Sequence, residues 1–418
     1  RQLRLCLLHP LQQGLSLSDR YDADCLPQKL LPKTSDRKEV FMNYSPVSPQ
    51  MTIGGLVKNP AYGLLSRYIF TYMTPDRYYA SLDSLGFKTA GFVPGLHRLE
   101  ELAASDRHEG SSYIHRIYSA EDCLANYDKA AVALLHFPAK IRETESFSSD
   151  IQTPASVPCT PYVLVIPGGA FNRQWGFIEG QAIAASLNEM GYTAFVLYYR
   201  TKQEPLMPKP IEDMHRAIAY IEEHAASFRI QKGHYMIGGF SAGACLAQEI
   251  ASDNFGYASR PAVIKAGSAG QISWKPEAIP APEAIFLAYT ACSNMDSYYR
   301  LQKLPADSPQ RAGMSPFLRR IGGPAFDEQS LEPFEILRHI DSSYPRTYLL
   351  ANEDDDVVPV VNTRNFDAKL NELGVAHICR IGRTGGHSFG LGIGLELEGW
   401  LEEAVQFWQN TNLPPVAH

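Results

Sequence analysis

The chain has 418 residues, of which 45% are hydrophobic and 20% are charged, and its formal net charge is -7. This length and composition are typical of a globular protein with a large core. The acidic balance excludes the strongly basic footprint of most nucleic-acid-binding proteins, and no apolar run reaches the roughly 18 residues of a membrane-spanning helix. We therefore expect no nucleic-acid partner and no membrane span.

The N-terminal part of the chain carries no catalytic motif. Residues 1–50 show little hydrophobic periodicity, so we expect a poorly ordered leader, and whether it is native to the protein stays open. Residues 51–110 place apolar side chains at helical spacing and predict three short helices. Two interpretations of this segment stay open: a cover packed on the core, or a lid or dimer surface.

Residues 111–418 alternate predicted strands with predicted helices, which indicates an α/β fold with a mostly parallel, doubly wound sheet. We expect strands at residues 113–118, 131–137, 162–167, 193–199, 234–240, 284–289, 346–351 and 376–381. We expect helices at residues 178–190, 210–226, 242–252, 362–373 and 395–409. The connection before the strand at 346–351 is too long for a simple crossover, so we predict a cap insertion at about residues 291–343. The alternative is an elaborated helical connection that does not touch the site.

The most informative motif is Gly-Phe-Ser-Ala-Gly at residues 239–243, which lies between an apolar run and a helical pattern. Strand, sharp turn and helix put Ser241 at the tip of a strained turn. Gly239 and Gly243 remove the side chains that would collide there. For this motif alone, a serine in a glycine-rich loop is the alternative, so the partners of the serine decide the interpretation.

Two downstream signals supply partners in the order Ser, acid, His. Four carboxylates at residues 353–356 follow an apolar strand, and we assign the acid to Asp355, with Asp354 as the alternative. Unlike the other histidines, His387 follows the last strand on a loop with two preceding glycines. Serine is a poor nucleophile at neutral pH, so a base such as histidine must accept its proton. A carboxylate then holds the imidazole in the right tautomer.

A second loop, Pro-Gly-Gly-Ala-Phe at residues 167–171, ends the apolar run 162–166. Acyl transfer places negative charge on a carbonyl oxygen, and preorganised backbone N–H groups stabilise that charge. We assign these oxyanion donors to Gly169, Ala170 and Ala242. An ordinary tight turn is the alternative interpretation of this loop.

With these motifs, residues from about 113 to 408 resemble the α/β-hydrolase superfamily, esterase/lipase branch, and most of all bacterial acetyl-xylan and feruloyl esterases and related carboxylesterases. Tyr199-Arg200 at a strand end, and Asp213 with Arg216 on the next helix, add to the resemblance. The resemblance implies an α/β-hydrolase fold and esters of acetylated or feruloylated plant polysaccharide as substrates. Pro167 stands where many relatives carry histidine, so we expect the anchoring of this loop to differ.

We therefore predict a serine esterase with the catalytic residues Ser241, Asp355 and His387, acting through an acyl-enzyme on a small-molecule or oligosaccharide ester. The chemistry requires no cofactor and no metal. A peptidase or amidase with the same triad, and a catalytically silent binding protein, stay open as alternatives. Seven scattered cysteines without a Cys-x-x-Cys pair favour a reducing cytoplasm, with secretion as the alternative. A homodimer through the N-terminal helical segment also stays open.

Overall fold

The computed structural model describes residues 47–57, 78–85, 91–109, 113–140, 159–252 and 278–410. All of them fall within Pro46–His418, the larger of the two units into which the chain divides. The leader that the sequence predicts, apart from its last four residues, lies outside the described residues. The first of the three helices expected in the segment 51–110, around residues 64–72, also lies outside the described residues.

Eight described strands form one sheet in the order β1-β2-β4-β3-β5-β6-β7-β8. β2 pairs antiparallel with β1 and β4, and the other neighbours pair in parallel. The strands are β1 (Ile114–His115), β2 (Ala133–Phe137), β3 (Thr160–Ile166), β4 (Thr193–Tyr198), β5 (Ile230–Phe240), β6 (Ala284–Ala288), β7 (Arg346–Asn352) and β8 (His377–Gly382).

Helices occupy most of the connections between these strands. The α-helices are α2 (Ile53–Val57), α5 (Val93–Glu109), α6 (Ala120–Ala125), α7 (Ala182–Glu189), α8 (Lys209–Glu223), α9 (Ala225–Phe228), α10 (Ala242–Ala247), α11 (Asn294–Lys303), α12 (Pro309–Gly322), α13 (Glu328–Leu331), α14 (Val361–Leu373) and α15 (Trp400–Gln409). Short 3₁₀ segments are η5 (Leu82–Leu85), η7 (Tyr127–Ala131), η9 (Gln248–Ala251), η10 (Glu332–Phe334) and η11 (Ile336–Arg338). A π-turn, η8 (Phe177–Gln181), leads directly into α7.

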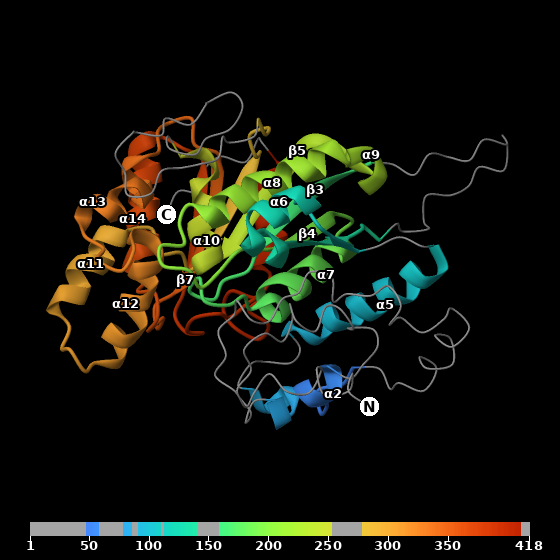
Figure 1. Ribbon diagram of the computed structural model, residues 1–418, viewed down its shortest axis with the longest axis horizontal. Helices are drawn as coiled ribbons and strands as arrows, with labels where there is room; N and C mark the ends of the chain where they lie inside the picture. The colour runs from blue at the N-terminus through green and yellow to red at the C-terminus, as the bar shows by residue number, and fades with distance from the viewer. Residues whose placement is uncertain are drawn as a thin grey trace. The chain divides into compact units, whose positions relative to one another are not determined.

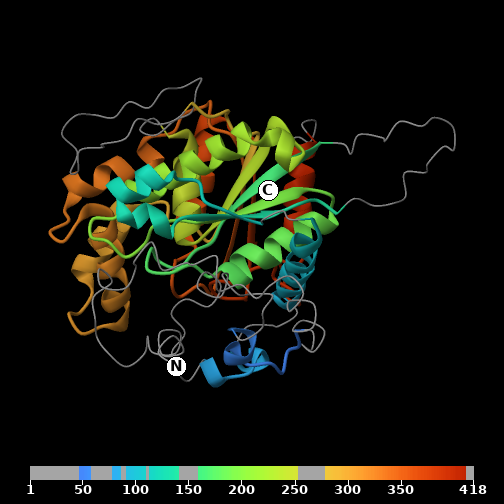
Figure 2. The ribbon, with the colours of Figure 1, turned by 45° about the vertical axis from the view of Figure 1, so that its right-hand side comes forward.

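The sheet is covered on both faces, as Figures 1 and 2 show: α8 and α10 lie on one face and α7 lies on the other. α5 packs along the outside of α7. A glycine allows this close approach, since a Cβ on Gly95 would lie 2.5 Å from the backbone nitrogen of Ala182. Arg98 of α5 also joins the two helices by donating a hydrogen bond to the Asn188 side chain of α7 at 2.9 Å. Part of the segment 51–110 is therefore helix packed on the core, and its role as a lid or dimer surface stays a prediction.

The strands form where the sequence has unbroken apolar runs. In β3, residues Val163 to Ile166 are fully buried, because helices cover both faces of a parallel sheet. All eight expected strands are present, which confirms the α/β fold class. The helix expected at 395–409 begins only at Trp400, since Gly399 before it has a φ of 88° and ends a run of turns.

The long connection between β6 and β7 is helical. It contains α11, α12, α13, η10 and η11, and Figure 1 shows α11, α12 and α13 (orange) gathered at one end of the sheet. Ser293 and Ser308 begin α11 and α12 as N-caps, each accepting a hydrogen bond from the backbone N–H three residues later.

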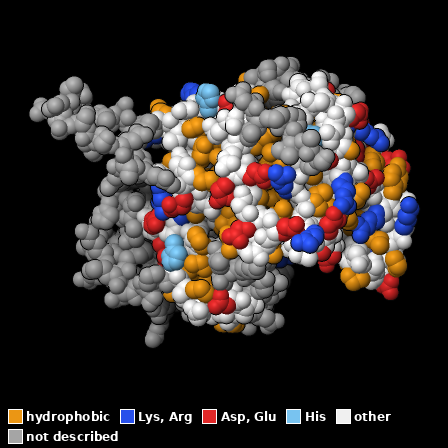
Figure 3. Space-filling model, turned by 180° about the vertical axis from the view of Figure 1, so that it is seen from behind, with side chains coloured by type: hydrophobic (Ala, Val, Ile, Leu, Met, Phe, Trp, Pro, Cys, Tyr) orange, Lys and Arg blue, Asp and Glu red, His pale blue; other side chains and the backbone are white. Residues whose placement is uncertain are grey.

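The described surface carries charges of both signs. On the face in Figure 3, acidic and basic side chains lie among apolar ones over the described residues. None of the described helices combines the length and the apolar character that crossing a bilayer requires.

Candidate active site

Ser241 lies in the sharp turn between β5 and α10, with φ 51° and ψ −120°. A non-glycine residue adopts such a conformation only when its surroundings enforce it. The flanking glycines explain the motif: a Cβ on Gly239 would lie 2.2 Å from the Gly243 carbonyl oxygen, and one on Gly243 would lie 2.1 Å from that of Ile166. The Ser241 N–H donates to the Ala288 carbonyl at 2.9 Å, which ties the turn to the end of β6.

The structure brings together the three side chains that the sequence predicts. His387 Nε2 lies 2.9 Å from Ser241 Oγ, and His387 Nδ1 lies 2.7 Å from Asp355 Oδ2. Both contacts have hydrogen-bond length, so Ser241, His387 and Asp355 form a continuous relay. The two ends of the relay differ in burial, because Asp355 is buried and Ser241 is partly exposed.

Two neighbouring aspartates after β7 have different partners. Asp355 faces His387 through Oδ2, and its Oδ1 accepts the N–H groups of Val357 and Val358 at 2.9 and 2.8 Å. Asp354 is exposed and accepts the N–H groups of Gly385 and Gly386 at 3.1 and 2.8 Å. These backbone hydrogen bonds lower the pKa of Asp354. Asp354 thus contacts the backbone of the histidine loop, and Asp355 contacts the imidazole.

The histidine loop needs unusual backbone geometry. Gly385 and Gly386 have φ of 146° and 61°, and the following Ser388 has φ 57°. Asn352 at the end of β7 donates to the Gly386 carbonyl at 3.1 Å. Tyr289 packs its ring edge-to-face on His387, with centroids 4.7 Å apart. These contacts fix where the imidazole can lie.

Three other histidines lie away from Ser241, His387 and Asp355. His215 is buried in α8, and burial lowers its pKa to about 4. His224 follows α8 and stacks on Tyr220. His377 in β8 contacts Asp367 and the Val375 carbonyl. All three therefore pack within the described part of the chain.

The oxyanion donors expected from sequence lie on two loops that meet at Ser241. A Cβ on Gly168 would lie 2.8 Å from Ser241 Cβ, so the loop 167–171 runs directly against the serine. Gly169 and Ala170 have positive φ, 136° and 54°. Within the described chain, the N–H groups of both have no hydrogen-bond acceptor. Ala242 is the first residue of α10, so the helix offers its N–H no partner.

Two buried side chains, Tyr199 and Glu179, anchor the loop at residues 167–171. The Tyr199 hydroxyl donates to the Pro167 carbonyl at 2.9 Å. Glu179 Oε2 accepts the Gly168 N–H at 2.8 Å, and its Oε1 accepts the Tyr289 hydroxyl at 2.9 Å. Sequence analysis missed Glu179 and Tyr289. The one signal for Glu179 was a charge in an otherwise apolar helical run.

The helical insertion between β6 and β7 also contacts the loop at residues 167–171. Phe317 of α12 stacks on Phe171, with centroids 5.4 Å apart and planes 10° from parallel. Arg320, also on α12, donates to the Ala170 carbonyl at 3.4 Å and to Asn172 at 3.3 Å. Residues of the insertion therefore help to define the surroundings of Ala170.

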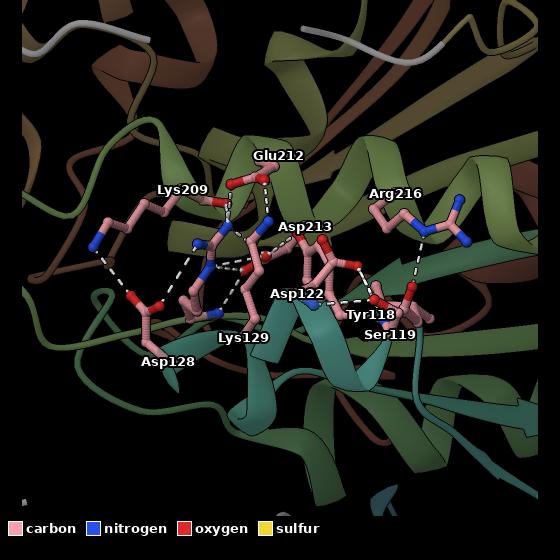
Figure 4. A network of polar contacts seen from close by, with 11 residues as sticks. Tyr118, Ser119, Asp122, Asp128, Lys129, Lys209, Glu212, Asp213 and Arg216 are labelled. Atoms are coloured by element: carbon pink, nitrogen blue, oxygen red, sulfur yellow. Dashed lines mark hydrogen bonds and ion pairs between the residues drawn. The ribbon is translucent and has the colours of Figure 1, made fainter. Parts of the chain in front are cut away.

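Arg200 of the Tyr-Arg motif is buried in a network of polar side chains, and Figure 4 labels Tyr118, Glu212 and Asp213 among its members. Arg200 pairs with Asp213 at 2.7 Å and with Glu212 at 2.6 Å, and the Tyr118 hydroxyl donates to Asp213 at 2.7 Å. Burial alone would lower the pKa of Arg200, but Asp213 beside it raises that pKa above its ordinary value. This network joins the end of β4 to α8. Arg216 on α8 donates to the Ile117 carbonyl at 2.8 Å.

No group of three or more His, Cys, Asp or Glu side chains in the described part of the chain is arranged to hold a metal ion. Five of the seven cysteines are described, and all five are free thiols. Cys245 lies one turn after Ser241 and is buried.

A family model described as BD-FAE matches residues 149–370, just over half of the 418 residues. The chain belongs to the BD-FAE family. The matched range contains Ser241 and Asp355 and ends before His387. The predicted membership of the esterase branch of the α/β-hydrolase superfamily is confirmed.

Relatives of this BD-FAE chain include named hydrolases. Endo-1,4-beta-xylanase B of Butyrivibrio fibrisolvens is 26% identical over 220 residues, which cover 50% of this chain and 29% of that protein. Esterase LipQ of Mycobacterium tuberculosis is 24% identical over 225 residues, covering 52% of this chain and 47% of that protein. The chain thus spans about half, or less, of the length of these relatives.

Solved structures show the same fold. The acetyl ester-xyloside bifunctional hydrolase of Caldicellulosiruptor lactoaceticus matches with a TM-score of 0.52 at 21% identity, covering 71% of this chain and 95% of that one. The propionate-bound esterase Est2 of Thermogutta terrifontis matches with a TM-score of 0.50 at 16% identity, covering 74% and 97%. With the sheet order, these matches establish the α/β-hydrolase fold.

Proposed function

We propose that this protein is a serine hydrolase of carboxylic esters with Ser241 as nucleophile, His387 as general base and Asp355 as the orienting acid. The observation that carries the proposal is the relay itself, with 2.7 Å between Asp355 and His387 and 2.9 Å between His387 and Ser241. The curated relatives named esterases support the reaction class.

In the first half of the reaction, Ser241 Oγ attacks the carbonyl carbon of the ester and its proton passes to His387 Nε2. The carbonyl π electrons move to the oxygen, which becomes an oxyanion. When the carbonyl re-forms, the bond to the alcohol oxygen breaks, and that oxygen takes the proton from Nε2. An alcohol leaves and an acyl-Ser241 ester remains.

In the second half, water attacks the acyl carbon and gives a proton to His387 Nε2. The tetrahedral intermediate collapses, the bond to Ser241 Oγ breaks, and Oγ recovers its proton from Nε2. A carboxylic acid leaves. Asp355 stays ionised throughout and stabilises the imidazolium that forms twice.

We assign oxyanion stabilisation to the N–H groups of Gly169, Ala170 and Ala242. Gly169 and Ala170 have no acceptor within the described residues, and the loop that carries them lies against Ser241. Donors fixed before the reaction need no reorganisation when charge develops, and losing one such donor typically costs about 100- to 1,000-fold in turnover.

We further propose that the insertion at about residues 291–343 is a cap that borders the substrate entrance. Its α12 contacts the oxyanion loop through Phe317 and Arg320. For the substrate, we propose acetyl or feruloyl esters of plant polysaccharides or their oligosaccharides. The relative named as a xylanase and the neighbour named as an acetyl ester-xyloside hydrolase motivate this choice.

The test is a set of initial hydrolysis rates on p-nitrophenyl acetate, butyrate and octanoate and on a feruloyl ester, with Ser241→Ala as the matched control. We expect turnover on short acyl groups and its loss in Ser241→Ala. Acetylated xylo-oligosaccharide, assayed for released acetate, tests the substrate class separately.

Equal hydrolysis by the parent protein and Ser241→Ala would contradict the proposal. Ser241-dependent cleavage of amides without cleavage of esters would replace the esterase with an amidase that uses the same residues. If the protein hydrolyses p-nitrophenyl acetate but releases no acetate from the oligosaccharide, the proposed esterase activity is kept and the proposed carbohydrate substrate is contradicted.

A further inference from the structure

A buried carboxylate outside the relay contacts three parts of the candidate site. Glu179 is fully buried. It accepts the Gly168 N–H from the oxyanion loop and the Tyr289 hydroxyl from the end of β6. The Ser388 hydroxyl, next to His387, lies close enough to lower the pKa of Glu179. One side chain therefore links the two loops that carry the proposed oxyanion donors and the proposed base.

The partners of Glu179 match the acceptor oxygens of a carboxylate. The Gly168 N–H can only donate, and a carboxylate offers acceptors to it and to both hydroxyl groups at once. Burial raises the pKa of Glu179 above its ordinary value, and a positive charge on His387 and the hydrogen bonds from Gly168 and Tyr289 counter part of that rise. These donors offset part of the cost of burying a charge there.

The backbone directs Glu179 toward the serine. It lies in the π-turn η8 (Phe177–Gln181), a rare form of helix that is often found at functional sites. A Cβ on Gly168 would lie 2.9 Å from Glu179 Oε2 and 2.8 Å from Ser241 Cβ. The carboxylate and the nucleophile therefore lie against the same residue of the oxyanion loop.

We propose that Glu179 is a positioning residue of the hydrolytic site. It fixes the oxyanion loop and the histidine loop relative to each other and faces the imidazolium formed on His387. This inference rests on the proposed function. Through Gly168, Glu179 sets the direction of the next two N–H groups, those of Gly169 and Ala170. Its negative charge adds to that of Asp355 when His387 accepts a proton.

The test is Glu179→Gln, which preserves shape, removes the charge and leaves one amide nitrogen that cannot accept a hydrogen bond. Rates on p-nitrophenyl acetate are divided by the number of active sites, counted from stoichiometric labelling with a fluorophosphonate. We expect kcat per labelled site to fall by about 10- to 100-fold, with KM changed by less than about threefold. A purely structural role would lower the number of labelled sites and leave kcat per site unchanged.

Glu249→Gln is the matched control. Glu249 is also buried, and burial raises its pKa to about 8, but it lies on η9 and has no contact with the relay among the hydrogen bonds of the described residues. We expect its kcat per labelled site to equal that of the parent protein. If Glu179→Gln does not fold, Tyr289→Phe removes one donor to Glu179 and should lower kcat per site in the same direction.

An unchanged kcat per labelled site in Glu179→Gln would contradict the proposed role of Glu179 but not the proposed esterase activity. If Glu179→Gln does not fold, an unchanged value in Tyr289→Phe would have the same meaning. An equal fall in Glu249→Gln would also contradict the role of Glu179, since any buried glutamate would then give the effect. A parent protein without Ser241-dependent turnover would overturn the proposed function and this inference together.

Discussion

At the scale of single residues, the structure separates two neighbouring aspartates that the sequence leaves as alternatives. The carboxylate of Asp355 is buried against His387, and that of Asp354 is exposed on the backbone of Gly385 and Gly386. A carboxylate at the imidazole sets its tautomer and stabilises its charge, whereas one on the loop backbone only restrains the loop.

We predict that Asp355→Asn lowers kcat by roughly 10⁴-fold, because an amide at this position holds the imidazole in the wrong tautomer. Asp354→Asn is its matched control and should lower kcat by no more than about tenfold, since it loses hydrogen bonds at an exposed site. Steady-state rates on p-nitrophenyl acetate measure both. A larger fall in kcat in Asp354→Asn than in Asp355→Asn would show that Asp354 is the orienting acid.

The sequence predicts the nucleophile and the base because both stand next to glycines that their backbone geometry requires. The acid is predicted only to within one residue, since four adjacent carboxylates look alike until the turn is folded. Glu179 could not be predicted. Its function depends on a π-turn, and contacts with Gly168 and Tyr289 span 11 and 110 residues of sequence.

At the scale of elements, the turn between β5 and α10 depends on backbone proximity. A Cβ on Gly243 would lie 2.1 Å from the Ile166 carbonyl oxygen, and backbone atoms cannot yield as a flexible side chain can. The same contact joins α10 to β3, so the geometry of the nucleophile and the packing of the sheet are coupled.

We therefore predict that Gly243→Ala lowers the melting temperature and abolishes turnover, because β3 and α10 must separate to admit the methyl group. Gly313→Ala in α12 is the control: nothing lies within 4 Å of its Cβ, and alanine favours a helix over glycine by roughly 0.5–1 kcal/mol. Calorimetry and esterase rates test the pair. Wild-type stability in Gly243→Ala would contradict the packing described for this turn.

The buried network between β4 and α8 gives a second prediction at this scale. Asp213→Asn should lower the free energy of unfolding by roughly 3–5 kcal/mol, because it leaves the Arg200 guanidinium buried without its fully buried counter-charge. Glu372→Gln, which breaks the exposed pair with Lys369, should cost less than about 1 kcal/mol. Denaturant unfolding distinguishes them, and equal losses would contradict the role of burial.

At the scale of the whole molecule, alternation of apolar strands and amphipathic helices was sufficient to predict the eight strands and the α/β fold class. The sequence did not predict the strand order, since the pairing of β2 with β4 instead of β3 joins segments that local patterns do not relate. The sequence predicts a cap insertion but leaves open whether it touches the site, because the contact between Phe171 and Phe317 forms only in the folded chain.

Two half-buried histidines make the stability of the fold depend on pH. Desolvation by burial lowers the pKa of His136 to about 3 and that of His115 to about 4, and the His136 ring stacks on Phe195. Below pH 6.5 the unfolded chain binds protons that these folded histidines do not. Stability is therefore complete above that pH and is lost as pH falls, by about 2 kcal/mol for His136 at pH 5.

The check is urea unfolding of the parent protein and His136→Phe at pH 7 and pH 5. The phenylalanine variant keeps an aromatic ring beside Phe195 and Phe228 and cannot titrate, so its loss of stability between the two pH values should be smaller. An equal loss of unfolding free energy between pH 7 and pH 5 in both proteins would show that His136 does not contribute to the pH dependence of stability.

The central claim, that Ser241 is the nucleophile activated by His387 and Asp355, is tested most directly by fluorophosphonate labelling followed by intact-mass and peptide mass spectrometry. We predict one adduct per chain, on the peptide that contains Ser241, with labelling slowed by orders of magnitude in His387→Ala and Asp355→Asn. No adduct, an adduct on another serine, or equal labelling rates in His387→Ala and the parent protein would contradict it.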